Sequence, residues 1–149
     1  MTELTRIFVT IGLTIGLTGA GCAGSLRPAS SSLPLIGRWR QTTLGSGDDS
    51  KPCPAEISVA DGGLVTCGKH DTVEFKPDGT FIAKFSGRDL EAVGTWRVQD
   101  STLAVTFTAP QEAAGVSRST QFEFTQDAQS MTIKAITGGT PTVETYVRD

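Results

Sequence analysis

Residues 73–85 read VEFKPDGTFIAKF, and this stretch decides the fold class. Apolar and polar side chains alternate over 73–76 and again over 80–85, and a period of two is the pattern of a half-buried β-strand. Between the two halves, residues 77–79 combine a proline, which fixes φ, with a glycine that tolerates a positive φ. The stretch therefore predicts two antiparallel strands joined by a tight hairpin.

The same alternation recurs along most of the chain, and no window of similar length shows a convincing helical period. Turn-forming residues at 99–101, 126–128 and 137–139 separate the alternating segments. A first strand is expected at Leu35–Thr43, with one or two more in Ala55–Cys67. The remaining alternating segments are 95–98, 103–108, 121–125, 131–133 and 142–148.

This pattern predicts an all-β protein, an antiparallel up-and-down meander of eight or nine strands. Sequential strands joined by tight turns pair antiparallel, and closing the meander into a small barrel removes the unpaired edges. A two-sheet sandwich is the alternative. We favour the barrel.

Alternation also predicts which large side chains point inward. The interior of an eight-stranded barrel is just wide enough to be filled by side chains or to hold one small ligand. We favour a mostly packed barrel, with a useful cavity as the alternative. On the last strand, Val143 and Val147 suggest that their face is the inner one. The residues expected inside, which would also contact a ligand, are Trp39, Phe75, Phe81, Phe85, Trp96, Phe107, Phe122 and Phe124.

The N-terminus resembles a bacterial lipoprotein signal. Residues 7–17 are apolar apart from two threonines, and small residues lead to Cys22. An apolar core of about 7–15 residues suits a signal peptide and is too short for a membrane-spanning helix, which needs about 20. The resemblance implies that residues 1–21 are cleaved and that Cys22 is acylated, for example with palmitate. Cleavage after Ala23 with plain secretion is the alternative, because Gly19 stands where lipoproteins usually have leucine.

The expected organisation is a signal peptide at 1–21, a flexible tether at 22–34 and a β-barrel domain at 35–149. The tether is rich in Ser, Pro and Ala. Ala23, rather than Asp, after the acylated cysteine implies an outer-membrane location facing the periplasm. The formal net charge is −3 with scattered basic residues, so nucleic acid is not an expected partner.

The chain has three cysteines. If Cys22 carries lipid, Cys53 and Cys67 remain as a pair, and an exported protein meets an oxidising compartment in which such a pair forms a disulfide. A bridge closing a loop of about 14 residues contributes on the order of 3 kcal/mol. We expect it to hold the excursion at Gly45–Pro54 against the barrel.

The two tryptophans occupy the same small motif, Gly-x-Trp, at Gly37 to Trp39 and at Gly94 to Trp96. A glycine in a strand allows close approach, and the indole two residues on can cover it. With the motifs at 67–75 and 77–81, this order of features resembles the lipocalin-like superfamily of small bacterial exported proteins, from Leu35 to about 136.

The resemblance implies that Trp39 lies across the closed end of the barrel and that an arginine from a late strand packs over its indole. Arg148 on the last strand is the expected partner, with Arg118 as the alternative. In a regular strand, Arg148 lies on the face opposite to that of Val143 and Val147. If both valines point inward, Arg148 can point inward as well only where a bulge or the end of the barrel interrupts the alternation. The larger ligand-carrying members have further signature segments that this chain lacks, so a lipid cargo does not follow.

Catalytic and metal motifs are missing from the sequence. His70 is the only histidine and there is no Gly-x-Ser-x-Gly, so a serine triad is not supported. The spacing of Cys53, Cys67 and His70 matches no familiar zinc pattern. We therefore expect no enzymatic activity, no cofactor and no metal.

The leading expectation is a non-enzymatic, lipid-anchored barrel in the bacterial envelope, with a small apolar molecule as its ligand if the open end is hollow. The alternatives are an envelope protein-interaction module, such as an inhibitor of secreted metalloproteases that uses residues 25–34 as an arm, and a purely structural envelope component. A cavity above roughly 300 Å³ would favour the ligand-binding hypothesis.

Overall fold

The computed structural model describes residues 34–149. The signal peptide at 1–21, the acylated Cys22, and all of the proposed tether and arm except Pro34 lie outside the described residues, and those expectations stay predictions.

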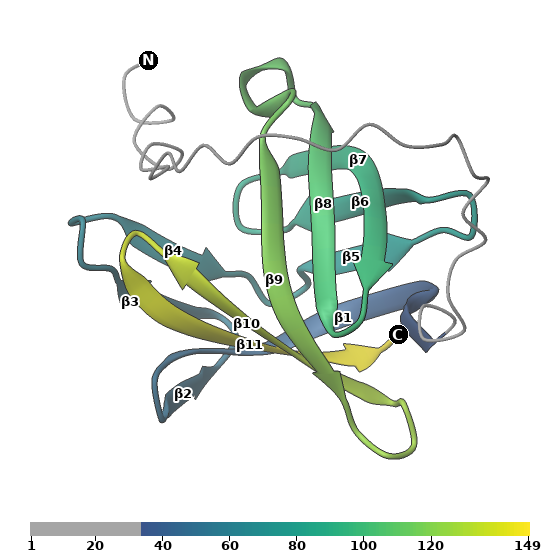
Figure 1. Cartoon of the computed structure of the whole chain (residues 1–149). Coiled ribbons are helices and arrows are strands. Elements are labelled where there is room, and N and C mark those ends of the chain that lie inside the picture. The colour runs from purple at the N-terminus through teal and green to yellow at the C-terminus, as the bar shows by residue number, and fades with distance from the viewer. Residues whose placement is uncertain (1–33) are drawn as a thin grey trace, which may run out of the picture.

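Eight antiparallel strands form a closed barrel (Figure 1). Strand β1 pairs with β5, and each strand from β5 to β11 pairs with the next one along the chain. The pairing of β11 with β1 closes the barrel. The predicted barrel is therefore confirmed and the sandwich is excluded. The strands are β1 (Gly37–Ser46), β5 (Thr72–Phe75), β6 (Thr80–Phe85), β7 (Leu90–Gln99), β8 (Thr102–Ala109), β9 (Ser117–Phe124), β10 (Ser130–Thr137) and β11 (Thr140–Arg148).

Three short strands lie outside the barrel circuit. The first half of β1 pairs with β5 through residues 37–40, which leaves one edge of residues 43–46 open to pair with β2 (Asp49–Pro52). The excursion expected at Gly45–Pro54 is therefore largely a hairpin, because this open edge recruits it. A separate hairpin joins β3 (Ala55–Ser58) to β4 (Leu64–Cys67), and a short 3-10 helix, η3 (Gln111–Ala113), precedes β9.

A β-bulge near Thr42 makes the two halves of β1 contribute side chains to different cores. The register with β11 shifts between Gln41 and Thr43. Such a bulge inserts one residue and changes which side chains face inward beyond it. Trp39 and Gln41 consequently face the barrel interior, and Leu44 is buried in a second, smaller core.

That smaller core contains the disulfide. Leu44, Ile57 and Cys67 are buried together, and Cys53 packs against them. Cys53 and Cys67 are bonded with their Cα atoms 5.6 Å apart, so the predicted disulfide is confirmed. It joins the residue after β2 to the end of β4 and thereby attaches the β3–β4 hairpin to the barrel wall.

The closed end of the barrel is built on Trp39. Its side chain is fully buried, and Nε1 donates a hydrogen bond to the carbonyl of Leu35 at 2.8 Å. The guanidinium of Arg148 lies 4.4 Å from the centroid of the indole ring, as the resemblance implied. Arg148 also donates to the carbonyl of Ile36 at 3.0 Å and to that of Pro34. The alternative partner, Arg118, lies elsewhere, on β9.

The expected inner face of the last strand was wrong. Glu144 and Tyr146 line the interior and Arg148 stacks on Trp39, so Val143 and Val147 belong to the other face. The β10–β11 and β1–β11 registers place no bulge within β11. The polar face of β11 points inward because its side chains have partners there. Tyr146 donates a hydrogen bond to Glu144, and Arg148 stacks on Trp39.

The groups that approach the glycines of the two Gly-x-Trp motifs are not the indoles that we expected. A Cβ atom at Gly37, where φ is +131°, would lie 2.7 Å from Nη1 of Arg148. A Cβ atom at Gly94 would lie 2.1 Å from the carbonyl oxygen of Thr106 and 2.7 Å from the ring of Phe81. Both glycines therefore permit close approach, but to an arginine, a neighbouring strand and a phenylalanine.

Candidate ligand-binding site

A cavity of about 380 Å³ occupies the barrel at the end opposite Trp39. The barrel is thus filled at one end and hollow at the other, which differs from the mostly packed interior that we favoured. The packed end contains Trp39, Phe122, Phe124 and Met131. Beyond these groups, the inward side chains, four phenylalanines among them, do not fill the interior.

The walls of the cavity are largely apolar. Phe81 packs edge-on against Phe107 with centroids 5.5 Å apart, and Phe75 packs against Phe81 at 6.3 Å. These contacts join the rings of β5, β6 and β8 into one aromatic wall. The apolar lining residues on strands are Val73, Phe75, Phe81, Ala83, Phe85, Leu103, Val105, Phe107, Ile133, Ala135 and Ile136.

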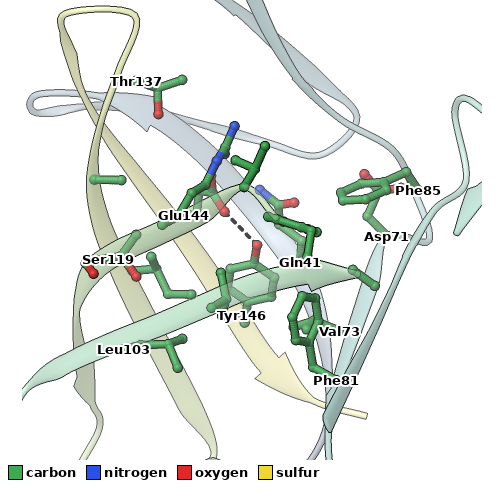
Figure 2. Close-up of a pocket in the computed structure, with 18 of the residues that line it drawn as sticks. Gln41, Asp71, Val73, Phe81, Phe85, Leu103, Ser119, Thr137, Glu144 and Tyr146 are labelled. Atoms are coloured by element: carbon green, nitrogen blue, oxygen red, sulfur yellow. Dashed lines mark hydrogen bonds between the residues drawn. The ribbon is translucent and has the colours of Figure 1, made fainter. Parts of the chain in front are cut away.

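A small polar group projects into this apolar space from β1 and β11. Figure 2 shows Gln41, Glu144 and Tyr146 close to one another, and the hydroxyl of Tyr146 donates to Oε2 of Glu144 at 2.6 Å. Gln41 pairs with Tyr146 across the two strands and is only 6% exposed. Its amide nitrogen makes one long hydrogen bond, 3.4 Å, to the carbonyl of Thr43.

Burial dominates the electrostatics of this group. It raises the pKa of Glu144, whereas the hydrogen bond from Tyr146 and the charge of Arg118 oppose that rise. The pKa of Tyr146 is raised well above its usual value by burial and by the charge of Glu144. Tyr146 therefore stays protonated and acts as a hydrogen-bond donor at physiological pH.

Asp71 is the other buried carboxylate at the cavity, and its oxygens already hold a loop in place. They accept hydrogen bonds from the backbone N–H groups of Gly68 and Ser86, both at 2.7 Å, and from the hydroxyl of Ser86 at 2.8 Å. These bonds join the segment before β5 to the end of β6. Asp71 therefore has a structural role that consumes much of its acceptor capacity.

The mouth of the cavity is bordered by the β3–β4 hairpin and by the β10–β11 turn. The backbone N–H of Asp61 donates to the carbonyl of Gly138 at 3.0 Å, and that of Ala60 donates to the hydroxyl of Thr140 at 2.7 Å. Both Asp61 and Gly138 line the cavity. The hairpin that carries the disulfide is therefore part of the entrance.

No family model matches the sequence, and no curated protein matches it. Among solved structures, a lipocalin-like protein from Bacteroides uniformis aligns with a TM-score of 0.50 and 11% identity, over 78% of this chain and 99% of that chain. The fold is lipocalin-like. An uncharacterized protein from Bacteroides eggerthii aligns with a TM-score of 0.49 and 11% identity, over 76% of this chain and 98% of that chain.

Within this lipocalin-like barrel, the aromatic residues expected inside divide into two groups. Phe75, Phe81, Phe85 and Phe107 line the cavity. The others lie in the packed core, where Trp96 donates its indole N–H to the carbonyl of Lys76 at 3.1 Å. The core group is Trp39, Trp96, Phe122 and Phe124.

The polar side chains of the cavity were missed at the level of sequence. Alternation of apolar residues does not mark Gln41, Glu144 or Tyr146, because it identifies only the apolar face of a strand. One signal was present: residues 142–148 alternate Thr-Val-Glu-Thr-Tyr-Val-Arg, so an inward Arg148 requires an inward Glu144 and Tyr146.

Within residues 34–149, no group of three or more His, Cys, Asp and Glu side chains is placed to hold a metal ion. The same residues include no helix with the length and apolar character needed to cross a membrane. His70 lies in a turn, where its backbone N–H donates to the hydroxyl of Ser86 at 3.1 Å.

Proposed function

We propose that this protein is a non-enzymatic binding protein that holds one small, mainly apolar molecule inside its lipocalin-like barrel. The observation that carries the proposal is the cavity of about 380 Å³ with apolar walls and a few converging polar groups. Ligand sites of proteins are concave, mostly apolar spaces of about 300–1,000 Å³ with a small number of placed polar groups. This cavity is at the small end of that range, which suits a compact ligand rather than a long lipid.

The proposal places the protein in the bacterial envelope, anchored through acyl chains on Cys22 and facing the periplasm. The N-terminal sequence supports it, as does the disulfide between Cys53 and Cys67, since such bonds persist in oxidising compartments. Stable attachment takes more than one acyl chain. A barrel tethered in this way would hold its ligand close to the membrane surface.

Native mass spectrometry of the protein purified from its own envelope tests both parts at once. The expected result is a lipid mass increment on Cys22 together with a noncovalent adduct of one small molecule per chain. A spectrum of bare protein, with neither adduct nor lipid, contradicts the proposal.

A matched pair of variants locates the ligand. Ala83→Phe places a ring in the cavity, since Ala83 is 7% exposed and lines it. Ala104→Phe adds the same ring to β8 at a position that does not line the cavity and is half-buried. The adduct should disappear from the first variant and remain in the second. Retention in both would place the ligand outside the barrel.

A further inference from the structure

The charged groups around the cavity are mainly acidic. Among the described residues that line it, Asp61, Asp71 and Glu144 carry carboxylates and Arg118 carries the one guanidinium. Asp61 borders the mouth, and Asp71 is engaged by three donors from Gly68 and Ser86. Glu144 is therefore the carboxylate placed to meet a ligand.

Glu144 lies where a ligand would contact it and apolar side chains together. It projects from the middle of β11 among the lining residues, beside Gln41 and Tyr146 (Figure 2). Tyr146 donates to one of its oxygens, and an ionised carboxylate has acceptor capacity for several donors. Gln41 adds an amide oxygen, a further acceptor, on the neighbouring strand.

The aromatic wall favours the same kind of ligand. Phe75, Phe81, Phe85 and Phe107 line the cavity, so the apolar body of such a ligand would bury its surface against their rings. An anionic ligand would gain from Arg118, but it would meet Glu144 in the same space. Burial also raises the pKa of Glu144, and a cation beside that carboxylate would offset the cost of its charge.

We infer that the cavity selects a small amphipathic cation, an apolar body that carries a protonated amine, with Glu144 as its counter-ion. This inference rests on the proposed ligand-binding function and names the class of ligand. The ammonium group lies at Glu144 and Gln41, and the apolar body lies against the phenylalanine rings. Arg118 opposes the ligand by its charge and limits the affinity.

Three probes with one apolar body and different charges test this inference. Isothermal titration calorimetry of the full chain at neutral pH uses naphthylmethylamine, naphthylmethanol and naphthoate, which are cationic, neutral and anionic. The amine should bind at least about tenfold more tightly than the alcohol, a difference of about 1.4 kcal/mol, and the naphthoate most weakly.

Glu144→Gln keeps the shape of the side chain and removes its charge. In this variant the amine should lose its advantage, so that the amine and the alcohol bind about equally. Glu123→Gln is the matched control, because Glu123 is an exposed carboxylate paired with Lys134 on the outside of the barrel. It should keep the wild-type preference. Arg118→Gln is a second test, which does not depend on whether the Glu144 variant folds. This variant should bind the amine more tightly and the naphthoate more weakly than wild type does.

The outcomes separate the two proposals. If the alcohol or the naphthoate binds the wild-type protein as tightly as the amine, the inference about charge is overturned while ligand binding stands. The same holds if Glu144→Gln folds and keeps the preference for the amine. If none of the three probes binds, the proposed function falls together with the inference.

Discussion

Trp39 anchors the closed end of the barrel through three kinds of contact. Its indole is fully buried, donates a hydrogen bond to Leu35, and is covered on one face by Arg148. It also lies 5.7 Å from the ring of Phe124 on β9, so it links β1 to a strand with which β1 does not pair. No other side chain could make this hydrogen bond and both ring contacts at once.

Trp39→Ala should lower the free energy of unfolding by about 3–5 kcal/mol, the usual cost of removing a large core aromatic. Urea unfolding followed by far-UV circular dichroism measures it. Arg97→Ala, on an exposed position of β7, is the control and should change stability by less than about 0.5 kcal/mol. Equal effects of the two substitutions would mean that Trp39 does not anchor the barrel.

Glu144 has the opposite influence on stability, because its charge is buried. Burial raises its pKa in the folded protein above the ordinary value of 4.5, so the folded state binds this proton more tightly than the unfolded state. Stability without ligand should therefore fall as the pH rises from about that value through the raised pKa. The contribution is present at low pH and lost at neutral pH.

Glu144→Gln should remove this fall and make the ligand-free protein more stable than wild type at neutral pH. Urea titrations over a pH series measure it. Glu123→Gln, on the outer surface, should follow the wild-type pH dependence. A neutral-pH stability of Glu144→Gln below that of wild type would show that the ionised carboxylate stabilises the fold.

At the scale of elements, the β3–β4 hairpin depends on its disulfide. Its own core is small, consisting of Leu44, Ile57 and Cys67 with a few half-buried neighbours, and two isolated strands are marginally stable in water. The bridge from Cys53 to Cys67 closes a loop with a sequence separation of 14. The hairpin also borders the cavity, so its attachment shapes the entrance.

Replacing both cysteines of this bridge with serine should lower the free energy of unfolding by about 3 kcal/mol, because the unfolded chain regains the entropy of the open loop. Guanidinium titrations of the full chain give this value. The eight-stranded barrel should remain, seen as an unchanged far-UV spectrum, while limited proteolysis cuts within 53–67. A double variant that resists the protease as well as wild type does would contradict this account.

Strand β7 must approach β8 closely at Gly94. A side chain there meets backbone of the neighbouring strand, which cannot move as a flexible side chain can. Gly94→Ala should therefore cost about 1–3 kcal/mol or more. Gly87→Ala is the matched control, since nothing lies within 4 Å of its Cβ position, and it should be neutral or stabilise by up to about 1 kcal/mol. Thermal unfolding of both variants tests the difference, and similar midpoints would refute it.

At the scale of the whole molecule, residues 34–149 pair with one another into a closed barrel. The pairing of β1 with β11 and the burial of Leu35 complete its closed end. The proposed anchor at Cys22 precedes these residues in the chain. Anchoring and folding should therefore be separable properties.

Cys22→Ser should release the protein from the membrane fraction and leave the unfolding midpoint of the barrel unchanged, because the substitution removes only the site of acylation. Fractionation of cells followed by immunoblotting measures the first effect, and thermal unfolding measures the second. If the variant stays with the membrane, acylation at Cys22 is not the anchor.

Several features of this protein could be predicted from the sequence alone. The period-two alternation around 73–85 and the turn residues between strands indicated an antiparallel barrel, because these signals are local and repeat along the chain. The pairing of Cys53 with Cys67 followed from the count of cysteines. The stacking of Arg148 on Trp39 was implied by the resemblance to lipocalins, and closure of the first and last strands brings the two residues within reach.

Other features depended on tertiary structure. The bulge near Thr42 and the open edge of β1 arise from pairing between distant segments, and they decide where the hairpins lie. The inner face of β11 is polar because Arg148 stacks on Trp39 of the neighbouring strand β1 and Glu144 accepts a hydrogen bond from Tyr146, whereas hydrophobicity alone favoured its valines. The cavity exists because the inward side chains do not fill the whole interior, and a local sequence pattern does not contain the distances between strands far apart in the chain.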